Sequence, residues 1–147
     1  MRLSQQADAI RARLLRADEG AAGQARAMSA LSAPEAAQVL PLLREYVRLK
    51  YMLLPQDMDL ESLEALGRRS LERVAVRGNQ VPGMDVSPHC GSASSATHKK
   101  VLLLLALRRD LEIHIPPADG ARCETLEQLA TCVSEQLRKK AAGAAAD

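Results

Sequence analysis

The chain has 147 residues, a length typical of one domain and sufficient to bury a hydrophobic core without disulfide staples. Its formal net charge is +2, from 20 basic and 18 acidic side chains, and it contains no Trp and no Phe. It therefore lacks the basic surface and the aromatic stacking platforms of nucleic-acid-binding proteins. Leu and Ala dominate and β-branched residues are few, so we expect an all-α fold.

The cysteines and the N-terminus indicate a cytoplasmic protein. Cys90, Cys123 and Cys132 are odd in number and lack the paired spacing of a zinc site, which is typical of reduced thiols. The first residues are polar, and arginines interrupt the stretch after them, so no signal region is expected. The apolar run at residues 101–107 is too short to cross a bilayer, and we expect no membrane span.

Two helices are expected in residues 1–58. The first is amphipathic and ends between residues 18 and 20, with one apolar face formed by Leu3, Ala7, Ile10 and Leu14. Residues 20–29 are small and fit either a loose connector or a weak continuation of the helix.

The second helix has a clear predicted start. Ser32, with Glu35 three residues later and a proline between them, predicts a capped N-terminus. We expect this helix to run to Leu54 and to bend at Pro41, which removes one backbone hydrogen bond.

A third helix is predicted from a possible cap at Asp59 to the stop signal Gly78-Asn79. Its apolar stripe consists of Leu60, Leu63, Leu66, Leu71 and Val74. From residue 79 to Ala96 the sequence is rich in Gly, Pro, Ser and Asp and has no periodicity. Connections of this length are usually functional or disordered.

Two more helices complete the predicted chain. One runs from Thr97 to Leu111 and is closed by Pro116-Pro117, and a short loop at residues 118–123 follows it. Thr125 and Gln128 form a capping box for the last helix, whose apolar face holds Leu126, Leu129, Val133 and Leu137. We expect the alanine-rich tail, residues 141–147, to be disordered.

Residues 59–140 resemble the acyl carrier protein family, also called phosphopantetheine-binding domains. In this family an Asp-Ser-Leu motif opens the second helix, which is aliphatic and is closed by Ile-Pro. A Thr-hydrophobic step starts the last helix, to which Glu124-Thr125-Leu126 is similar. The aliphatic and closing positions are occupied here by Val101, Leu103, Leu107, Leu111 and Ile115-Pro116. The resemblance implies an acyl carrier-like helical bundle, with residues 1–58 as an N-terminal helical extension.

The resemblance also implies a covalently attached 4'-phosphopantetheine. An ungapped match places Asp-Ser-Leu on Ala96-Thr97-His98, so Thr97 takes the place of the modified serine. A small shift of register would instead bring Ser95 or Ser94 to that place. The implied function is a specialised carrier that holds an acyl or related intermediate in lipid or secondary metabolism. Its implied partners are a phosphopantetheinyl transferase and acyl-transferring or acyl-activating enzymes.

The charge of the helix predicted at residues 97–111 indicates which partners can bind it. Family members are usually acidic, whereas here four basic residues stand against Asp110 and Glu112, namely Lys99, Lys100, Arg108 and Arg109. Enzymes that dock on this helix should therefore present acidic or apolar surfaces.

Two other functions are open from the residues. The hydroxyls at residues 92–97 also fit a simple helix cap with loop serines, and the protein would then be an interaction module that has lost the arm. A metal or redox protein around Cys90 is a third hypothesis, with His89, His98 and Cys123 as further candidates. The sequence has no glycine-rich phosphate loop, nucleophile elbow or paired catalytic carboxylates, so we do not expect an enzyme.

Overall fold

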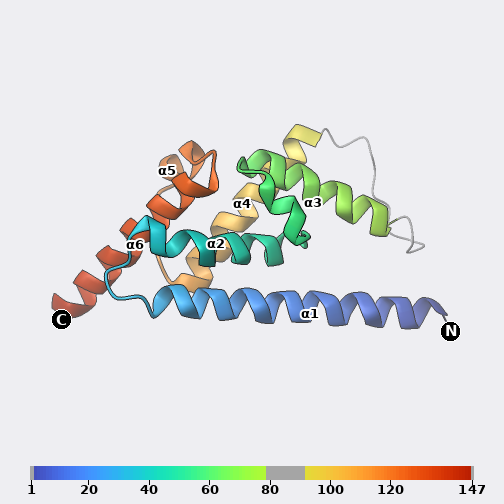
Figure 1. The fold of residues 1–147 in the computed structure, drawn as a ribbon, viewed down its shortest axis with the longest axis horizontal. Coiled ribbons are helices and arrows are strands. Elements are labelled where there is room, and N and C mark those ends of the chain that lie inside the picture. Colours follow the sequence, from blue (N-terminus) through green and yellow to red (C-terminus); the bar gives the residue numbers. More distant parts are fainter. Residues whose placement is uncertain (1, 79–91, 147) are drawn as a thin grey trace.

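The computed structural model describes residues 2–78 and 92–146, and every regular element in these residues is a helix (Figure 1). The all-α prediction is confirmed. The elements are the α-helices α1 (Arg2–Ser29), α2 (Ala36–Lys50), α3 (Leu63–Gly78), α4 (Ser92–Leu111), α5 (Pro117–Arg122) and α6 (Leu126–Ala146), with a 3-10 helix η1 (Pro55–Asp59).

α2 packs on α1 and on α6, and α4 packs on α3 and, less extensively, on α1. In Figure 1, α1 lies along one edge of the molecule, with α2 beside its C-terminal half, and α4 crosses α2 between α3 and the end of α1. The hydroxyl of Tyr46 on α2 donates a 2.7 Å hydrogen bond to Asp110 on α4. One hydrophobic core runs across the predicted boundary at residue 58, and it includes Met28, Leu43, Leu66, Leu107 and Leu129.

The first helix includes residues 20–29, so the alternative of a continued helix is correct and the end expected at residues 18–20 is wrong. It continues to Ser29 because Ala21, Ala25 and Met28 are buried in the core. A Cβ atom on Gly20 would stand only 2.9 Å from Leu49 Cδ1, so the missing side chain lets α1 and α2 approach closely. Packing against α2 therefore overrides the low helix propensity of the two glycines in this stretch.

The bounds of α2 also differ from the prediction. The helix starts after Glu35, whose backbone N–H donates to Gln38 Oε1 at 2.9 Å, and Ser32 is not its cap. It ends at Lys50 because Met52 adopts a left-handed φ of 56°. Pro41 lies inside the helix as expected.

The start of α3 lies later than predicted. Ser62 is the residue before the helix, and its Oγ accepts the backbone N–H of Ala65 at 3.3 Å, whereas Asp59 ends η1. The helix is described to Gly78, and the predicted stop at Gly78-Asn79 stays a prediction because Asn79 lies outside the described residues.

The starts of α3 and α6 are joined by backbone hydrogen bonds. The N–H of Leu63 donates to the carbonyl of Glu124 at 2.9 Å, and the N–H of Leu126 donates to the carbonyl of Glu61 at 3.2 Å. The predicted capping box is confirmed, since Thr125 and Gln128 exchange two 3.2 Å hydrogen bonds.

Helix α4 and the C-terminus contain more helix than predicted. α4 starts at Ser92 rather than at Thr97, and Ala96 is buried against Gly67, where a Cβ would lie 3.4 to 3.5 Å from Ala96. The predicted loop after Pro116 contains the short helix α5. Residues 141–146 continue α6 although the sequence predicts disorder there, which is consistent with the high helix propensity of Ala.

A buried carboxylate holds η1 against α3. The side chain of Asp57 is fully buried and accepts hydrogen bonds from Arg73 (2.8 and 3.0 Å), from Arg69 (3.0 Å) and from the backbone N–H of Leu54 (2.9 Å). These bonds, led by the one from Arg73, lower the pKa of Asp57 to about 2. Asp57 thus joins the end of α2, η1 and α3.

We expect this carboxylate to make stability depend on acid pH. Its folded-state pKa of about 2 lies below the ordinary 3.8, so its contribution to the free energy of unfolding is complete above about pH 5 and is lost as the pH falls from about 4 to 2. The loss should be about 1–2 kcal/mol, because one pKa unit corresponds to about 1.4 kcal/mol and the partly exposed arginines are screened.

Urea denaturation at a series of pH values measures this contribution. The Asp57→Asn variant should be less stable at neutral pH, and the difference from the unmodified chain should shrink as the pH falls. A difference that stays constant from about pH 6 to pH 3 would contradict the role of this carboxylate.

Candidate functional site

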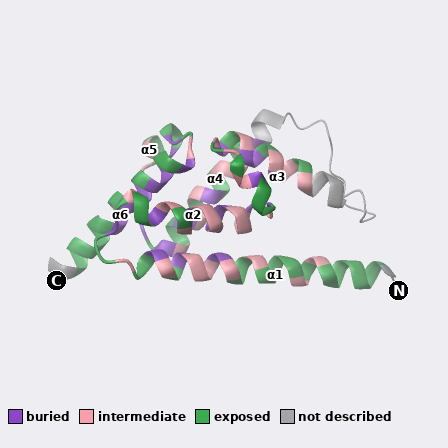
Figure 2. Cartoon of the chain, in the orientation of Figure 1, coloured by how far each residue is buried: buried purple, intermediate pink, exposed green. Residues whose placement is uncertain are grey.

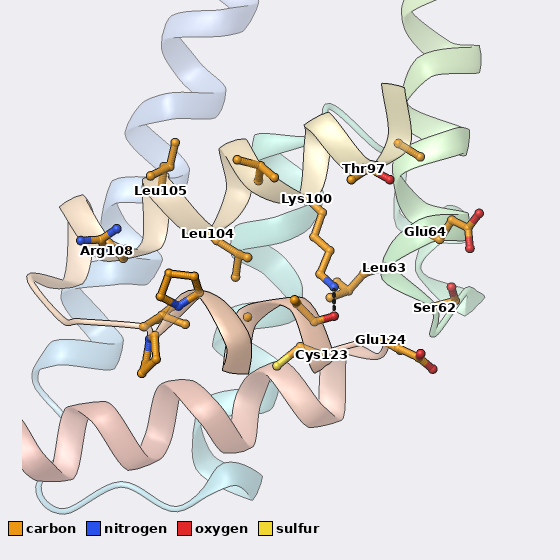
Figure 3. A pocket seen from close by; sticks show the side chains of 17 residues that line it. Ser62, Leu63, Glu64, Thr97, Lys100, Leu104, Leu105, Arg108, Cys123 and Glu124 are labelled. Carbon is orange, nitrogen blue, oxygen red and sulfur yellow. Dashed lines mark hydrogen bonds between the residues drawn. The ribbon is translucent and has the colours of Figure 1, made fainter. Parts of the chain in front are cut away.

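A groove of about 670 Å³ lies between α4, α5 and the starts of α3 and α6 (Figure 3). Its volume falls in the range of about 300–1,000 Å³ that is typical of small-molecule sites. The lining residues are Ser62, Leu63, Glu64, Ala96, Thr97, Lys100, Val101, Leu104, Leu105, Arg108, Ile115, Pro116, Pro117, Gly120, Ala121, Cys123 and Glu124.

The inner part of the groove is apolar. Leu63, Ile115 and Cys123 are buried, and Leu104 points from α4 into the space toward α5 (Figure 3). Gly120 faces the same space, where an added Cβ would stand 2.8 Å from Leu104 Cδ1. The absence of a side chain on Gly120 therefore keeps room between α4 and α5, and the walls suit a hydrocarbon ligand.

Charged groups stand in the groove and at its edges. The ammonium of Lys100 reaches from α4 to α5 and donates to the carbonyl of Ala121 at 3.1 Å (Figure 3). Arg108 lies further along α4, and Glu64 and Glu124 lie on the opposite side at the starts of α3 and α6. Polar groups at the edge of an apolar groove can orient a ligand that has a polar end.

The predicted attachment residues lie at the start of α4. Thr97 is exposed and lines the groove, which runs from it along α4 to Pro116. It is the sixth residue of α4, so the expectation that the helix starts at Thr97 is wrong, and Thr97 lies beyond the first turn, where backbone N–H groups have no partner within the helix. Ser94 and Ser95 occupy the first turn of α4, and their side chains lie outside the described part of the chain.

Lys99 is separate from the groove, although it is next to Lys100 in the sequence. Its ammonium donates to Ser70 Oγ at 2.7 Å and lies 5.4 Å from the centre of the Tyr51 ring. The Ser70 hydroxyl donates in turn to the carbonyl of Tyr51 at 2.7 Å. Burial lowers the pKa of Lys99. This lysine therefore joins α4 to α3 and does not face the groove.

The cysteines in the described part of the chain behave as core residues. Cys123 and Cys132 are both buried, and their thiols contact each other. Burial raises the pKa of Cys123 and raises that of Cys132 to about 11, so both remain protonated near neutral pH. Cys123 therefore contributes apolar wall to the groove rather than a nucleophile.

Only some of the residues named in the metal hypothesis lie in the described part of the chain. His89 and Cys90 lie outside the described residues, and His98 is exposed on α4. Within residues 2–78 and 92–146, no three His, Cys, Asp or Glu side chains are grouped so that they could hold a metal ion. The redox or metal function around Cys90 remains a hypothesis.

An apolar ridge, formed by Val101, Leu102 and Leu105, lies on the outer side of α4. These side chains are 47 to 50 % exposed. Val101 and Leu105 also line the groove, so the ridge and the groove share one edge. Exposed apolar residues that adjoin a groove indicate a surface that contacts a ligand or a partner.

Some of the site could not be read from the sequence. The apolar run on α4 indicates a helix covered on most sides, but it does not tell which leucines meet the core and which meet the groove. Leu104, Gly120 and the contact from Lys100 to Ala121 depend on how α5 packs on α4, and the sequence suggested only a loop there.

Comparisons of the chain with family models, with curated proteins and with solved structures gave no match. The resemblance to acyl carrier proteins therefore rests on the residues of this chain alone. None of the helices in the described residues is both long and apolar enough to cross a membrane.

We expect the groove to bind a fluorescent fatty acid, and we expect Leu104→Trp to fill it. Loss of space for about two methylene groups should weaken binding about tenfold. The matched control is Leu102→Trp, because Leu102 is on the ridge and does not line the groove. Fluorescence titration of the three chains measures the effect, and equal affinities for the two variants would show that the fatty acid binds elsewhere.

Proposed function

We propose that the protein is a specialised acyl carrier, which shelters an acyl or related chain in the groove between α4 and α5 while a phosphopantetheine arm tethers it. The observation that carries this proposal is that Thr97, the residue in register with the family's modified serine, stands at the end of an apolar groove. A chain tethered there would pass the Lys100 side chain, which crosses the groove to Ala121, and would then meet the apolar walls at Leu104 and Ile115.

The order of the elements supports the proposal. α3, the long connection at residues 79–91, the aliphatic helix α4 and the last helix α6 follow one another as the resemblance implies. α4 ends at Leu111, where Glu112 takes a left-handed φ of 52°, so the Ile115-Pro116 step follows the helix and leads into α5 rather than closing α4. The capping box at Thr125 opens α6. These features favour a carrier-like order of elements in residues 59–140, and α2 of the N-terminal extension completes the packing by covering α6.

The described residues fit a phosphopantetheine arm in two respects. Thr97 is exposed, so a modifying enzyme can reach it, and the groove beside it is apolar enough for a chain carried on the arm. The arm, when bound, supplies a terminal thiol that holds an acyl group as a thioester. Ser95 and Ser94 remain alternative attachment residues in the preceding turn of α4.

The surface of α4 indicates what kind of surface a partner enzyme should have. The ridge of Val101, Leu102 and Leu105 is apolar, and Lys100, Arg108 and Arg109 lie on the same helix. Acyl-transferring or acyl-activating enzymes that receive this helix should have an apolar patch with acidic groups around it.

The ridge also favours a second candidate function. A carrier-like bundle without an arm could use the same apolar surface to bind a partner protein, in which case the groove would receive a side chain of that partner. This candidate predicts that none of the three hydroxyls is modified.

Intact-mass measurement separates the two functions. The chain is incubated with coenzyme A and a phosphopantetheinyl transferase of broad specificity, and a gain of one phosphopantetheine is expected. The gain should disappear in whichever of Thr97→Val, Ser95→Ala and Ser94→Ala removes the attachment residue. If Thr97 is that residue, Thr97→Ser should react faster, because a primary hydroxyl is less hindered.

The matched control for these variants is a hydroxyl on another helix. Thr131→Val removes an exposed hydroxyl of α6, remote from this part of α4, and should leave the mass gain unchanged. No mass gain with several transferases, in chains whose circular dichroism shows folded helices, would contradict the carrier function and support the interaction module.

A further inference from the structure

The N-terminal half of α1 extends beyond the packed body of the molecule. Figure 1 shows α2 beside only the C-terminal half of α1, and Figure 2 shows the other half mostly exposed. Residues 2–17, which we call the arm, form about four turns and about 24 Å of helix. Leu3 and Leu14 on the arm are 59 % and 48 % exposed.

The arm continues the apolar face that packs in the core. At 100° per residue, Leu3, Ile10 and Leu14 fall on the same side of α1 as the buried residues Ala21 and Met28. The C-terminal part of this face is covered by α2, and the N-terminal part has no cover of that kind. The arm therefore presents an apolar stripe that a further helix can extend across.

A shallow hollow marks where such a helix would meet the body. It has a volume of about 250 Å³, and its walls combine Ala17 on α1 with Leu49 and Leu54 at the end of α2. Arg13 and Arg16 stand on the α1 side. The stripe leads directly to this hollow, because Ala17 borders both.

The charge of the arm indicates the chemistry of the partner. Residues 2–17 contain four arginines and one aspartate, a charge of +3, whereas the whole chain carries only +2. Within the described residues, no carboxylate lies at ion-pair distance from Arg11, Arg13 or Arg16. Arg48, across the hollow, is already paired with Glu45. Arg13 and Arg16 stand at the hollow, about 80° and about 140° around α1 from the centre of the stripe, and these unpaired arginines favour an acidic partner there.

We propose that the arm and the hollow form a docking surface for an acidic amphipathic helix of a partner protein. A second copy of this chain fits less well, because it would bring two arms of charge +3 together. An anionic membrane also fits less well, because the arm has no aromatic residue to anchor at a lipid surface and the hollow is concave. The surface is distinct from the groove at α4.

Selection from a peptide library tests the proposal with the full chain. The library displays helical peptides of about 20 residues, which span the arm, on yeast. Each peptide has a fixed Leu and Ala stripe, and Glu, Gln or Lys is varied at the flanking positions. Peptides selected by the chain should be enriched in Glu over Lys, and their binding should weaken as the salt concentration rises.

Variants then locate the binding surface. Arg13→Gln with Arg16→Gln should weaken binding of the selected peptides about tenfold, the sum of two exposed ion pairs. Arg26→Gln with Lys139→Gln removes the same charge at exposed positions away from the arm and should have no effect. Leu14→Gln should also weaken binding, and circular dichroism should show unchanged helix content in every variant.

Three results would overturn the proposal. The first is a peptide experiment that fails. Either the selection shows no preference for Glu, or the affinity for the selected peptides falls equally in the test and control variants. The second is a dimer in sedimentation equilibrium that Leu14→Gln dissociates, which would assign the surface to a second copy. The third is arm-dependent binding to vesicles of phosphatidylcholine and phosphatidylserine without selection of acidic peptides, which would assign it to a membrane.

Discussion

The apolar circumference of α4 is the constraint on which the rest of the structure depends. Seven consecutive residues, 101–107, are apolar, and this run predicts a helix covered on most sides. That prediction is wrong, because Val101, Leu102 and Leu105 are 47 to 50 % exposed. Leu103, Leu107 and Leu111 are buried in the core. The hydrogen bond from Tyr46 to Asp110 fixes how α2 crosses the far end of the helix. What remains uncovered is the groove beside Leu104 and the ridge next to it.

The N-terminal helices follow from the same constraint. α2 and the second half of α1 bury one side of α4 and α6, so α4 can keep its opposite side open without losing its place in the fold. Asp57 secures the other boundary, since it joins the end of α2 to α3. The N-terminal helices thus cover the side of α4 and α6 that lies away from the candidate site. Residues 2–17, at the start of α1, contribute little to the core.

The sequence predicted those parts of the fold that local chemistry determines. The all-α class and the Thr125–Gln128 capping box were correct, because propensity and a local cap decide them. The sequence left the continuation of α1 through residues 20–29 undecided and placed the start of α4 too late, because contacts of Gly20 with Leu49 and of Ala96 with Gly67 come from distant segments. For the same reason, the sequence pointed to Thr97 but could not reveal the groove beside it.

The central claim is that an acyl chain lies in the groove between α4 and α5. Nuclear Overhauser effects from the methylene protons of S-decanoyl pantetheine to the methyl groups of the labelled chain test it most directly. The account predicts contacts to Leu104 and Ile115, which line the groove. Contacts confined to Leu102, on the outer ridge, or to Leu14 on the arm, would contradict it.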